Sequence, residues 1–576
     1  MNIIAKTRQD LKSYKNFNVS IYCPVSDVNG ITDIEEFDKK FSLFTNNIKV
    51  GRVYLECYRG MEWATKEQIS KVKEYFNSKG IATSGGITTS DDSKGEGYLS
   101  LCYSSEKGKD IVIKSAKLCA ELFDEIILDD FYFENCRCEK CVKIKGSKSW
   151  SQMRLEQKLE ISKEMVAAAK EVNPNVNFII KYPQWYEYYH ETGYNPETEP
   201  DIFDSIYTGT ETRNPTYAQQ HLPKYLSYFV MRYLESAAPG RNLGGWFDPY
   251  ECNYNITSYL EQGYLTLYGK AKEVTLFCLN SLLYDRDFRL FVPAVGQLFE
   301  EADAFLDKLG NPIGAIAYRP VNGRGEDYLH NYLGMCGIPM DATCTYPENA
   351  DVVFLAESAS ADSDIITKIH NSLMNGSDVV VTSGFVNKMG KAFANTFVNV
   401  SYSSRKAIVS QYANTKDNGL TISGKYAGSK EILIPQLDYC TNDVWELAAA
   451  YGNDNNFPIV LRCRYGNGRI SVITIPDDMG DLYAYPAQVL NTIRELFSKN
   501  LPVRLEGCSK AMMFLYDNNT FVVRSDLPYD ETFSLVFDED VKSIKGINNR
   551  FELVPQNGKV EMRLAPSSNY VFEINR

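Results

Sequence analysis

Histidine is scarce in this sequence, and no stretch of it is strongly basic. Only four of the 576 residues are His, far apart at His190, His221, His330 and His370. This scarcity argues against a histidine-rich catalytic metal site and weakens any Ser-His-Asp triad. The formal net charge is −13, and without a basic run the electrostatic footprint of a nucleic-acid-binding protein is missing. We therefore expect no nucleic-acid partner.

Long hydrophobic runs are also missing. No apolar stretch approaches the roughly 20 residues that span a bilayer as a helix, so we expect no membrane association. Residues 1–8 lack the apolar core and the cleavage site of an export signal. The sequence is therefore typical of a cytoplasmic protein, or of a periplasmic one whose signal has been removed. The 14 cysteines are spread along the chain, unlike the dense disulfide framework of a small secreted domain.

Apolar runs alternate with helical patterns in the part of the chain up to residue 311. Eight runs are expected to be strands: Val19–Cys23, Val50–Cys57, Ile81–Ile87, Glu125–Asp130, Val176–Tyr182, Ser205–Glu211, Leu243–Asp248 and Val274–Leu279. The helical patterns include Lys66–Lys79, Asp110–Leu122, Ser151–Val172 and Leu290–Leu309. This order predicts an α/β fold, a (β/α)₈ TIM barrel over residues 1–311. An open doubly wound sheet is the alternative, but no glycine-rich phosphate loop follows the first strand.

Two further domains are expected after the barrel. Residues 312–501 predict a second α/β unit, with buried strands at Ile313–Tyr318, Val352–Leu355, Val379–Thr382 and Ile470–Ile475. Helices are expected between them at Glu326–Met335, Asp362–Met374 and Ala487–Phe497, and a β-prone insertion at residues 394–465. Residues 502–576 alternate apolar and polar positions in short runs, which predicts a small antiparallel β domain.

Charged and aromatic side chains gather where the barrel strands are expected to end. The clearest case is the fourth strand, which runs straight into Asp129 and Asp130. A buried charge must be paired or neutralised, so adjacent carboxylates fit the mouth of a barrel, where (β/α)₈ enzymes keep their chemistry. A surface turn is the alternative. The other candidates at strand ends are Glu56, Arg59, Lys181, Glu211, Arg213, Trp246 and Asp248.

Three cysteines lie close together just after Asp130. Cys136, Cys138 and Cys141 fall within six residues, and a structural zinc site usually has four thiolate or imidazole ligands. The fourth candidate is Cys102, in the segment that leads into the helix before the fourth strand. The spacing predicts a structural zinc ion, because four thiolates leave no open position for substrate. Free thiols, or a disulfide between two of them, are the alternative.

The order of these motifs resembles that of the family 42 β-galactosidases and related barrel glycosidases. In that family a Cys in a short segment joins a later Cys-x-Cys-x-x-Cys to bind zinc, and Cys102 with the Cys136 triplet fits this order. Its acid/base lies in an Asn-Glu pair that ends the fourth strand, where this chain has Asp129-Asp130. The resemblance implies a flavodoxin-like domain over 312–501 that forms an oligomer, with a trimer favoured.

The Asp-Asp pair departs from the family pattern, and the expected seventh strand ends in Asp248, with no nucleophilic Glu. A fourth-strand Asp paired with a sixth-strand acid is similar instead to α-galactosidase-type and α-fucosidase-type barrels, where that Asp is the nucleophile. We therefore expect a retaining, exo-acting glycosidase of a galactoside-like substrate. Its catalytic residues would be Asp130, the nucleophile, and Glu211, the acid/base.

The remaining strand-end residues are expected to bind the sugar. This group comprises Glu56, Arg59, Asp129, Lys181, Arg213, Trp246 and Asp248, with Asp248 in reserve for either catalytic role. One alternative is an inverting glycosidase that uses Asp130 and Asp248 with an activated water. The other is a carbohydrate-binding protein without catalysis, built on a degenerate barrel.

Overall fold

The computed structural model describes residues 13–92, 98–415, 421–452 and 455–576. Its contacts divide the chain into two compact units, one ending at Asp307 and one running from Lys308 to Arg576. Each unit is described by itself below. Within the described residues, no helix combines the length and the apolar character needed to cross a membrane.

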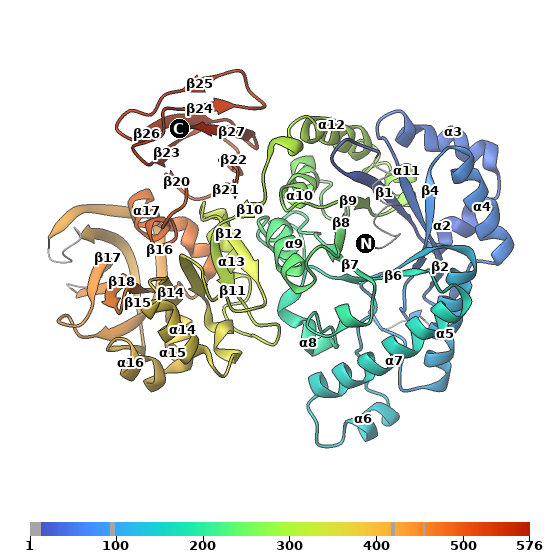
Figure 1. Cartoon of the computed structure of the whole chain (residues 1–576), viewed down its shortest axis with the longest axis horizontal. Helices are drawn as coiled ribbons and strands as arrows, with labels where there is room; N and C mark the ends of the chain where they lie inside the picture. Colours follow the sequence, from blue (N-terminus) through green and yellow to red (C-terminus); the bar gives the residue numbers. More distant parts are fainter. Residues whose placement is uncertain (1–12, 93–97, 416–420, 453–454) are drawn as a thin grey trace. The chain divides into compact units, whose positions relative to one another are not determined.

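The first unit is a closed barrel of eight parallel strands, because β1 pairs with both β2 and β9 (Figure 1). The strands are β1 (Asn18–Cys23), β2 (Arg52–Arg59), β4 (Ala82–Ile87), β5 (Glu125–Leu128), β6 (Asn177–Tyr182), β7 (Ser205–Gly209), β8 (Asn242–Phe247) and β9 (Glu273–Leu276). A short β3 (Glu62–Trp63) pairs antiparallel with β2. The predicted TIM barrel is confirmed. Four strands, β5, β7, β8 and β9, end earlier than expected, so Asp129, Asp130, Glu211 and Asp248 lie in the loops that follow the first three.

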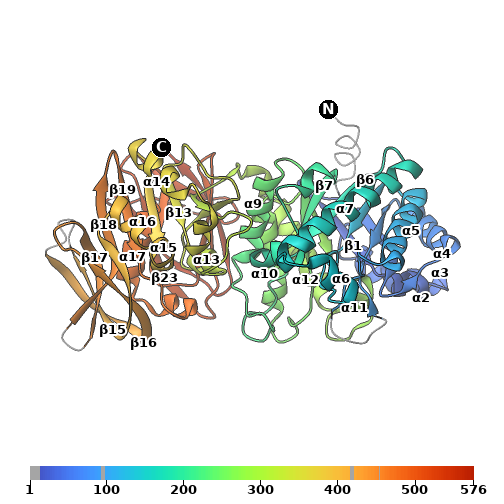
Figure 2. The same ribbon diagram turned by 90° about the horizontal axis from the view of Figure 1, so that it is seen from below.

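Helices surround these strands on the outside (Figures 1 and 2). They are α2 (Val25–Gly30), α3 (Ile34–Thr45), α4 (Lys66–Ser78), α5 (Glu106–Leu122), α6 (Glu139–Lys145), α7 (Trp150–Val172), α8 (Tyr189–Thr192), α9 (Leu226–Ala237), α10 (Ile256–Tyr268), α11 (Leu279–Tyr284) and α12 (Phe291–Asp303). The prediction placed the start of α5 at Asp110, which was wrong. The helix begins at Glu106 because the Ser105 hydroxyl accepts the N–H of Gly108 at 2.9 Å and caps it. The single helix expected at Leu290–Leu309 is also wrong, since α12 ends at Asp303.

The second unit contains one large mixed sheet with helices. Its strand order is β12–β11–β13–β14–β19–β18–β17–β15–β16, parallel from β12 to β19 and antiparallel beyond. Bounds are β11 (Ala315–Tyr318), β12 (Met340–Thr343), β13 (Val352–Leu355), β14 (Asp378–Thr382), β15 (Val400–Thr415), β16 (Ile422–Tyr439), β17 (Trp445–Gly452), β18 (Asn455–Tyr465) and β19 (Gly468–Ile473). The helices are α13 (Leu329–Met335), α14 (Ile365–Met374), α15 (Ser383–Met389), α16 (Lys391–Thr396) and α17 (Ala487–Leu496).

The C-terminal segment folds into two antiparallel sheets, as expected. Their strand orders are β10–β21–β22–β27–β24–β25 and β20–β23–β26. Bounds are β10 (Pro312–Ile313), β20 (Val503–Glu506), β21 (Ala511–Tyr516), β22 (Thr520–Ser525), β23 (Glu531–Phe537), β24 (Ser543–Gly546), β25 (Glu552–Leu553), β26 (Lys559–Leu564) and β27 (Asn569–Asn575). The strand expected at Ile313–Tyr318 is wrong, because Ile313 pairs with β21 while Ala315 begins β11. The division at residues 311 and 501 stays a prediction.

A buried ion-pair network lies at the end of the barrel where the strands begin, opposite the end that carries Asp129 and Asp130. Arg52 begins β2, and its guanidinium lies 3.1 Å from Glu125 and 3.2 Å from Glu273, the first residues of β5 and β9. All three side chains are at most 10% exposed. Charges buried this far cost solvation free energy, which good pairing geometry can offset. This end of the barrel therefore serves stability.

We predict that Arg52→Met destabilises the first unit strongly, because it leaves two buried carboxylates without their cation. The expected loss is about 3–5 kcal/mol of unfolding free energy. Lys117→Met is the control: it breaks an exposed ion pair with Glu171, which is worth about 0–1 kcal/mol. Urea denaturation of both variants provides the comparison, and equal losses would contradict the assignment.

Candidate active site

One buried ammonium group lies among the predicted site residues. Lys181, near the end of β6, is 1% exposed. Its Nζ lies 2.9 Å from Oδ2 of Asp130, 2.9 Å from Oε1 of Glu211 and 3.4 Å from Oδ1 of Asp129. Burial opposes a positive charge here, but the three carboxylates outweigh it and raise the pKa of Lys181. The structure thus brings together three acids and a lysine that the sequence singled out.

Asp129 is fully engaged by donors of the protein. Its Oδ2 accepts from Arg59 Nη2 at 2.7 Å and from the Thr88 hydroxyl at 3.3 Å. Its Oδ1 accepts from the backbone N–H of Asp130 at 2.8 Å and faces Lys181. Burial would raise the pKa of Asp129, but Lys181 and Arg59 outweigh that effect and lower it to about 2. Asp129 is therefore a fixed negative charge that orients two cations.

Asp130 is the one acid of the three with a substantial exposed surface. Its side chain is 20% exposed, against 3% for Asp129 and 5% for Glu211. Burial and the charge of Asp129 raise the pKa of Asp130, while Lys181 acts in the opposite direction. The Tyr194 hydroxyl donates to its backbone carbonyl at 2.6 Å and fixes the loop at this residue. An accessible carboxylate held in this way is suited to attack a substrate.

Glu211 lies two residues beyond β7 and is buried. Burial raises the pKa of Glu211 to about 7, with Asp130 and Asp248 adding to the effect and Lys181 opposing it. Oε1 takes the bond from Lys181, whereas Oε2 has no hydrogen-bond partner among the described residues. A carboxyl group with a raised pKa and one unshared oxygen is suited to hold a proton near neutral pH.

Arg213 and Asp248 form a separate ion pair beside this cluster. Arg213 donates from Nε and Nη2 to the two oxygens of Asp248, at 3.0 and 2.8 Å, and from Nη1 to Glu251 at 3.3 Å. Burial disfavours the guanidinium charge, but Asp248 outweighs it and raises the pKa of Arg213. Both oxygens of Asp248 thus accept hydrogen bonds from Arg213, which makes this carboxylate the ion-pair partner of the guanidinium.

Five of the predicted sugar-binding residues are at most 4% exposed: Glu56, Asp129, Lys181, Trp246 and Asp248. Glu56 is 0% exposed and accepts from Tyr22, from the backbone N–H of Val25 and from Arg59. Trp246 is 1% exposed, and the ammonium of Lys181 lies 4.0 Å from its ring centroid. Glu56 and Trp246 therefore help to position neighbouring cations: Glu56 accepts hydrogen bonds from Arg59, and the ring of Trp246 packs against the ammonium of Lys181.

Half-buried aromatic side chains surround the cluster, and sequence reasoning did not select them. Arg59 lies over the rings of Phe131 and Phe277, at 5.6 and 5.8 Å from their centroids. Trp185 packs edge to face on Phe133 at 6.3 Å. Partly exposed rings of this kind suit contact with the apolar face of a sugar. The Phe-Tyr-Phe triplet after Asp130 was the feature of the sequence that could have indicated Phe131 and Phe133.

A second buried lysine supports the loop that carries Asp130. Lys158 of α7 is 0% exposed, with its Nζ 3.6 Å from the ring centroid of Tyr194 and 4.5 Å from that of Tyr132. Glu199 lies 3.1 Å away as its counter-ion. Burial lowers the pKa of Lys158 to about 8, although Glu199 opposes this. Lys158 therefore anchors the same Tyr194 that holds Asp130.

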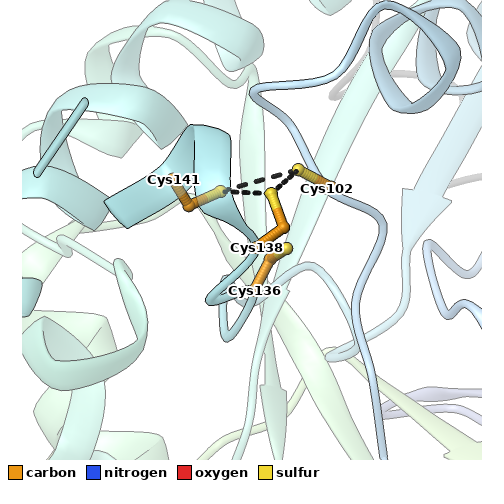
Figure 3. Close-up of side chains that lie close together, drawn as sticks. All are labelled: Cys102, Cys136, Cys138 and Cys141. Atoms are coloured by element: carbon orange, nitrogen blue, oxygen red, sulfur yellow. Dashed lines mark hydrogen bonds between the residues drawn. The ribbon is translucent and has the colours of Figure 1, made fainter. Parts of the chain in front are cut away.

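The four predicted cysteine ligands come together next to this loop (Figure 3). All four Sγ atoms lie within 4.8 Å of one another. Three of the Sγ–Sγ distances are 3.8 Å for Cys102–Cys138, 3.6 Å for Cys102–Cys141 and 3.6 Å for Cys138–Cys141. A tetrahedral ion with metal–sulfur bonds of about 2.3 Å requires sulfur atoms about 3.8 Å apart. None of the four forms a disulfide, so the cluster can hold a metal ion.

Comparison with known proteins assigns this chain to a family. Residues 6–293, half of the chain, match the model described as a probable glycosyl hydrolase, catalytic domain. Residues 310–478 match the second domain of the uncharacterized protein SSO3021, and residues 502–574 match a probable glycosyl hydrolase, C-terminal domain. SSO3021 of Saccharolobus solfataricus is 24% identical over 537 residues, covering 85% of this chain and 87% of that protein.

Solved structures share the fold across nearly the whole chain. The β-galactosidase from Bacillus circulans sp. alkalophilus is 12% identical with a TM-score of 0.65, covering 98% of this chain and 100% of that one. The α-L-fucosidase isoenzyme 2 from Paenibacillus thiaminolyticus is 12% identical with a TM-score of 0.68, covering 97% and 100%. The chain is a barrel glycosidase. It belongs to the glycosyl hydrolase family whose catalytic-domain model spans its barrel.

Proposed function

We propose that the protein is a retaining, exo-acting glycosidase in which Asp130 is the nucleophile and Glu211 the general acid/base. The observation that carries this proposal is the ammonium shared by the two carboxyl groups. Oδ2 of Asp130 and Oε1 of Glu211 each lie 2.9 Å from Nζ of Lys181, so these oxygens are at most 5.8 Å apart. Retaining glycosidases hold their carboxyl groups about 5–5.5 Å apart, and inverting ones about 6.5–9.5 Å.

The two carboxyl groups differ in the way that their proposed roles require. Asp130 has the exposed surface that a nucleophile needs, and Lys181 stabilises its ionised form. Glu211 has a pKa raised to about 7 by burial, so that it retains a proton near neutral pH. Opposite environments for two nearby acids separate a proton donor from a nucleophile.

In the proposed reaction, Glu211 donates its proton to the glycosidic oxygen while an oxygen of Asp130 bonds to the anomeric carbon. The bond from that carbon to the leaving group breaks, and a glycosyl ester on Asp130 results. Glu211, now ionised, then takes a proton from water, whose oxygen displaces Asp130. Two displacements give retained configuration. Asp129, Arg59 and Lys181 position the two acids, and Phe131, Trp185 and Phe277 contact the sugar.

The inverting alternative is less well supported. It requires Asp248 as the second acid, but Arg213 occupies both of its oxygens at 3.0 and 2.8 Å. The support for a galactoside-like substrate comes from proteins of similar fold. Two of the structural neighbours with near-complete coverage are described as a β-galactosidase and an α-L-fucosidase.

We also propose that the four-cysteine cluster binds a metal ion, that this ion is zinc and that its role is structural. Four cysteine sulfurs are the usual ligand set of a closed zinc site. The metal would tie Cys102, ahead of α5, to the loop that begins at Asp129. We propose separately that the chain assembles into a homo-oligomer, with a trimer favoured, through residues 312–501. This proposal rests on the order of the domains.

We predict that the variants Asp130→Ala and Glu211→Ala fail in different ways. Asp130→Ala should abolish turnover of every substrate, because no covalent intermediate can form. Glu211→Ala should lose about 10²–10⁴-fold on substrates with poor leaving groups and far less on dinitrophenyl glycosides, which need no proton. Azide should rescue Glu211→Ala with a glycosyl azide of retained configuration, and Asp130→Ala, if at all, with inversion.

Asp248→Ala is the matched control for this pair. If Asp248→Ala loses activity selectively on poor leaving groups while Glu211→Ala does not, the acid/base is Asp248 and the assignment is wrong. Kinetics on a series of aryl glycosides, with the azide products identified by NMR, distinguishes the two outcomes.

We predict a bell-shaped pH profile of kcat/KM. The alkaline limb should have an apparent pKa near that of Glu211, about 7, because the acid must be protonated. The acidic limb should lie above the usual range of an aspartate, because the pKa of Asp130 is raised by burial. In Glu211→Gln, assayed on dinitrophenyl glycosides, the alkaline limb should disappear. An unchanged alkaline limb in that variant would assign it to another group.

Zinc analysis tests the metal proposal. The purified, untagged chain should contain one zinc per chain, and Cys138→Ser should lower the thermal midpoint of unfolding because one ligand is lost. Cys463→Ser, at a buried cysteine of β18 remote in sequence from the cluster, is the control and should retain the metal. Absence of zinc, or a disulfide among the four cysteines, would contradict the proposal.

A further inference from the structure

A positively charged hollow lies in the second unit, between the β18–β19 hairpin and the end of α17. It has a volume of about 600 Å³. Five cationic side chains line it: Arg462, Arg464, Arg469, Lys499 and Arg504. Two carboxylates share its wall, those of Asp378 and Glu495. The hollow therefore has an excess of three positive charges on a chain whose net charge is −13.

Two of the arginines are placed directly opposite each other. Arg464 of β18 and Arg469 of β19 are register partners in the antiparallel pair, and both are exposed. In the described part of the chain, neither arginine has a carboxylate at ion-pair distance. The nearby Asp378 pairs with Lys499 instead, at 3.4 Å. Like charges in directly opposed positions destabilise a strand pair. This arrangement costs stability unless an anion lies against the two guanidinium groups.

Arg504 adds a second sign of a missing partner. Its Nη2 donates to Glu506 at 2.9 Å, but its Nε is buried and has no hydrogen-bond acceptor among the described residues. A buried N–H without an acceptor is costly. The lining of the hollow thus includes two exposed arginines without an ion-pair partner among the described residues and one arginine with an unsatisfied N–H group.

We propose that this hollow binds a ligand that carries a phosphate or sulfate group. Guanidinium forks bind such oxyanions through paired hydrogen bonds. A volume of about 600 Å³ exceeds one inorganic ion and lies within the range of about 300–1,000 Å³ typical of small-molecule sites. A sugar phosphate or sugar sulfate therefore fits better than the free ion. This site lies outside the barrel and is independent of the proposed catalytic residues.

Calorimetric titration of the full chain tests the proposal. The probes are inorganic phosphate, inorganic sulfate, glucose 6-phosphate, glucose 6-sulfate and glucose, at an ionic strength held constant with NaCl. We expect binding of the charged probes and none of glucose. Tighter binding of the charged sugars than of the free ions identifies the source as a saccharide, and the reverse identifies a free oxyanion. No binding of any charged probe overturns the proposal.

Paired variants make the test specific. Arg464→Gln/Arg469→Gln should weaken binding at least about tenfold while leaving glycosidase activity unchanged. It should also raise the thermal midpoint in anion-free buffer, because the repulsion is removed. The control is Arg405→Gln/Arg563→Gln, which removes two arginines whose side chains are 67% and 72% exposed in the same unit; it should bind normally.

Two results of this comparison would overturn the site. Equal weakening in both double variants would show that binding follows net charge alone. A change of oligomeric state on sedimentation in Arg464→Gln/Arg469→Gln, without anion binding by the unmodified chain, would show that the hollow meets an acidic surface of a second copy.

Discussion

The active site depends on one constraint: a single buried ammonium faces three carboxyl groups. Lys181 cannot neutralise Asp129, Asp130 and Glu211 together, and Arg59 is shared between Asp129 and Glu56. Two cations thus face four carboxyl groups, so two of these groups must each retain a proton or expose the charge to water. The surroundings decide which groups do so: Asp129 has four donors, Asp130 has solvent, and Glu211 has one bond and a raised pKa.

The loop after β5 is held from several sides, and this gives the cluster its geometry. Tyr194 bonds to the backbone of Asp130, and Lys158 packs against the ring of Tyr194. Further along, Cys136 and Cys138 approach Cys102 and Cys141. The nucleophile that we propose lies on this loop and needs such support, because small displacements of reacting atoms cost large factors in rate.

The barrel was predictable because each of its buried strands reads as a short apolar run bounded by polar turns. Several of the polar residues after those runs do lie together at one end of the barrel, and the four cysteines selected by their spacing form one cluster. The sequence pattern did not indicate how deeply each side chain is buried. Glu56 and Trp246 lie at strand ends like Asp130, yet their side chains are buried beneath the site, which depends on contacts across the barrel. Lys158 was missed, although a charge in register with Ile161 and Met165 on the buried face of α7 was a readable signal.

The most direct test of the account is to trap the covalent intermediate. A fluorinated glycoside with a good leaving group, matched to whichever aryl glycoside the enzyme hydrolyses, should inactivate it and leave one sugar on the chain. Peptide mapping by mass spectrometry should then place that sugar on Asp130. A label on Asp129, Glu211 or Asp248 would contradict the assignment, and the absence of any covalent adduct during turnover, with inverted product, would contradict the retaining mechanism.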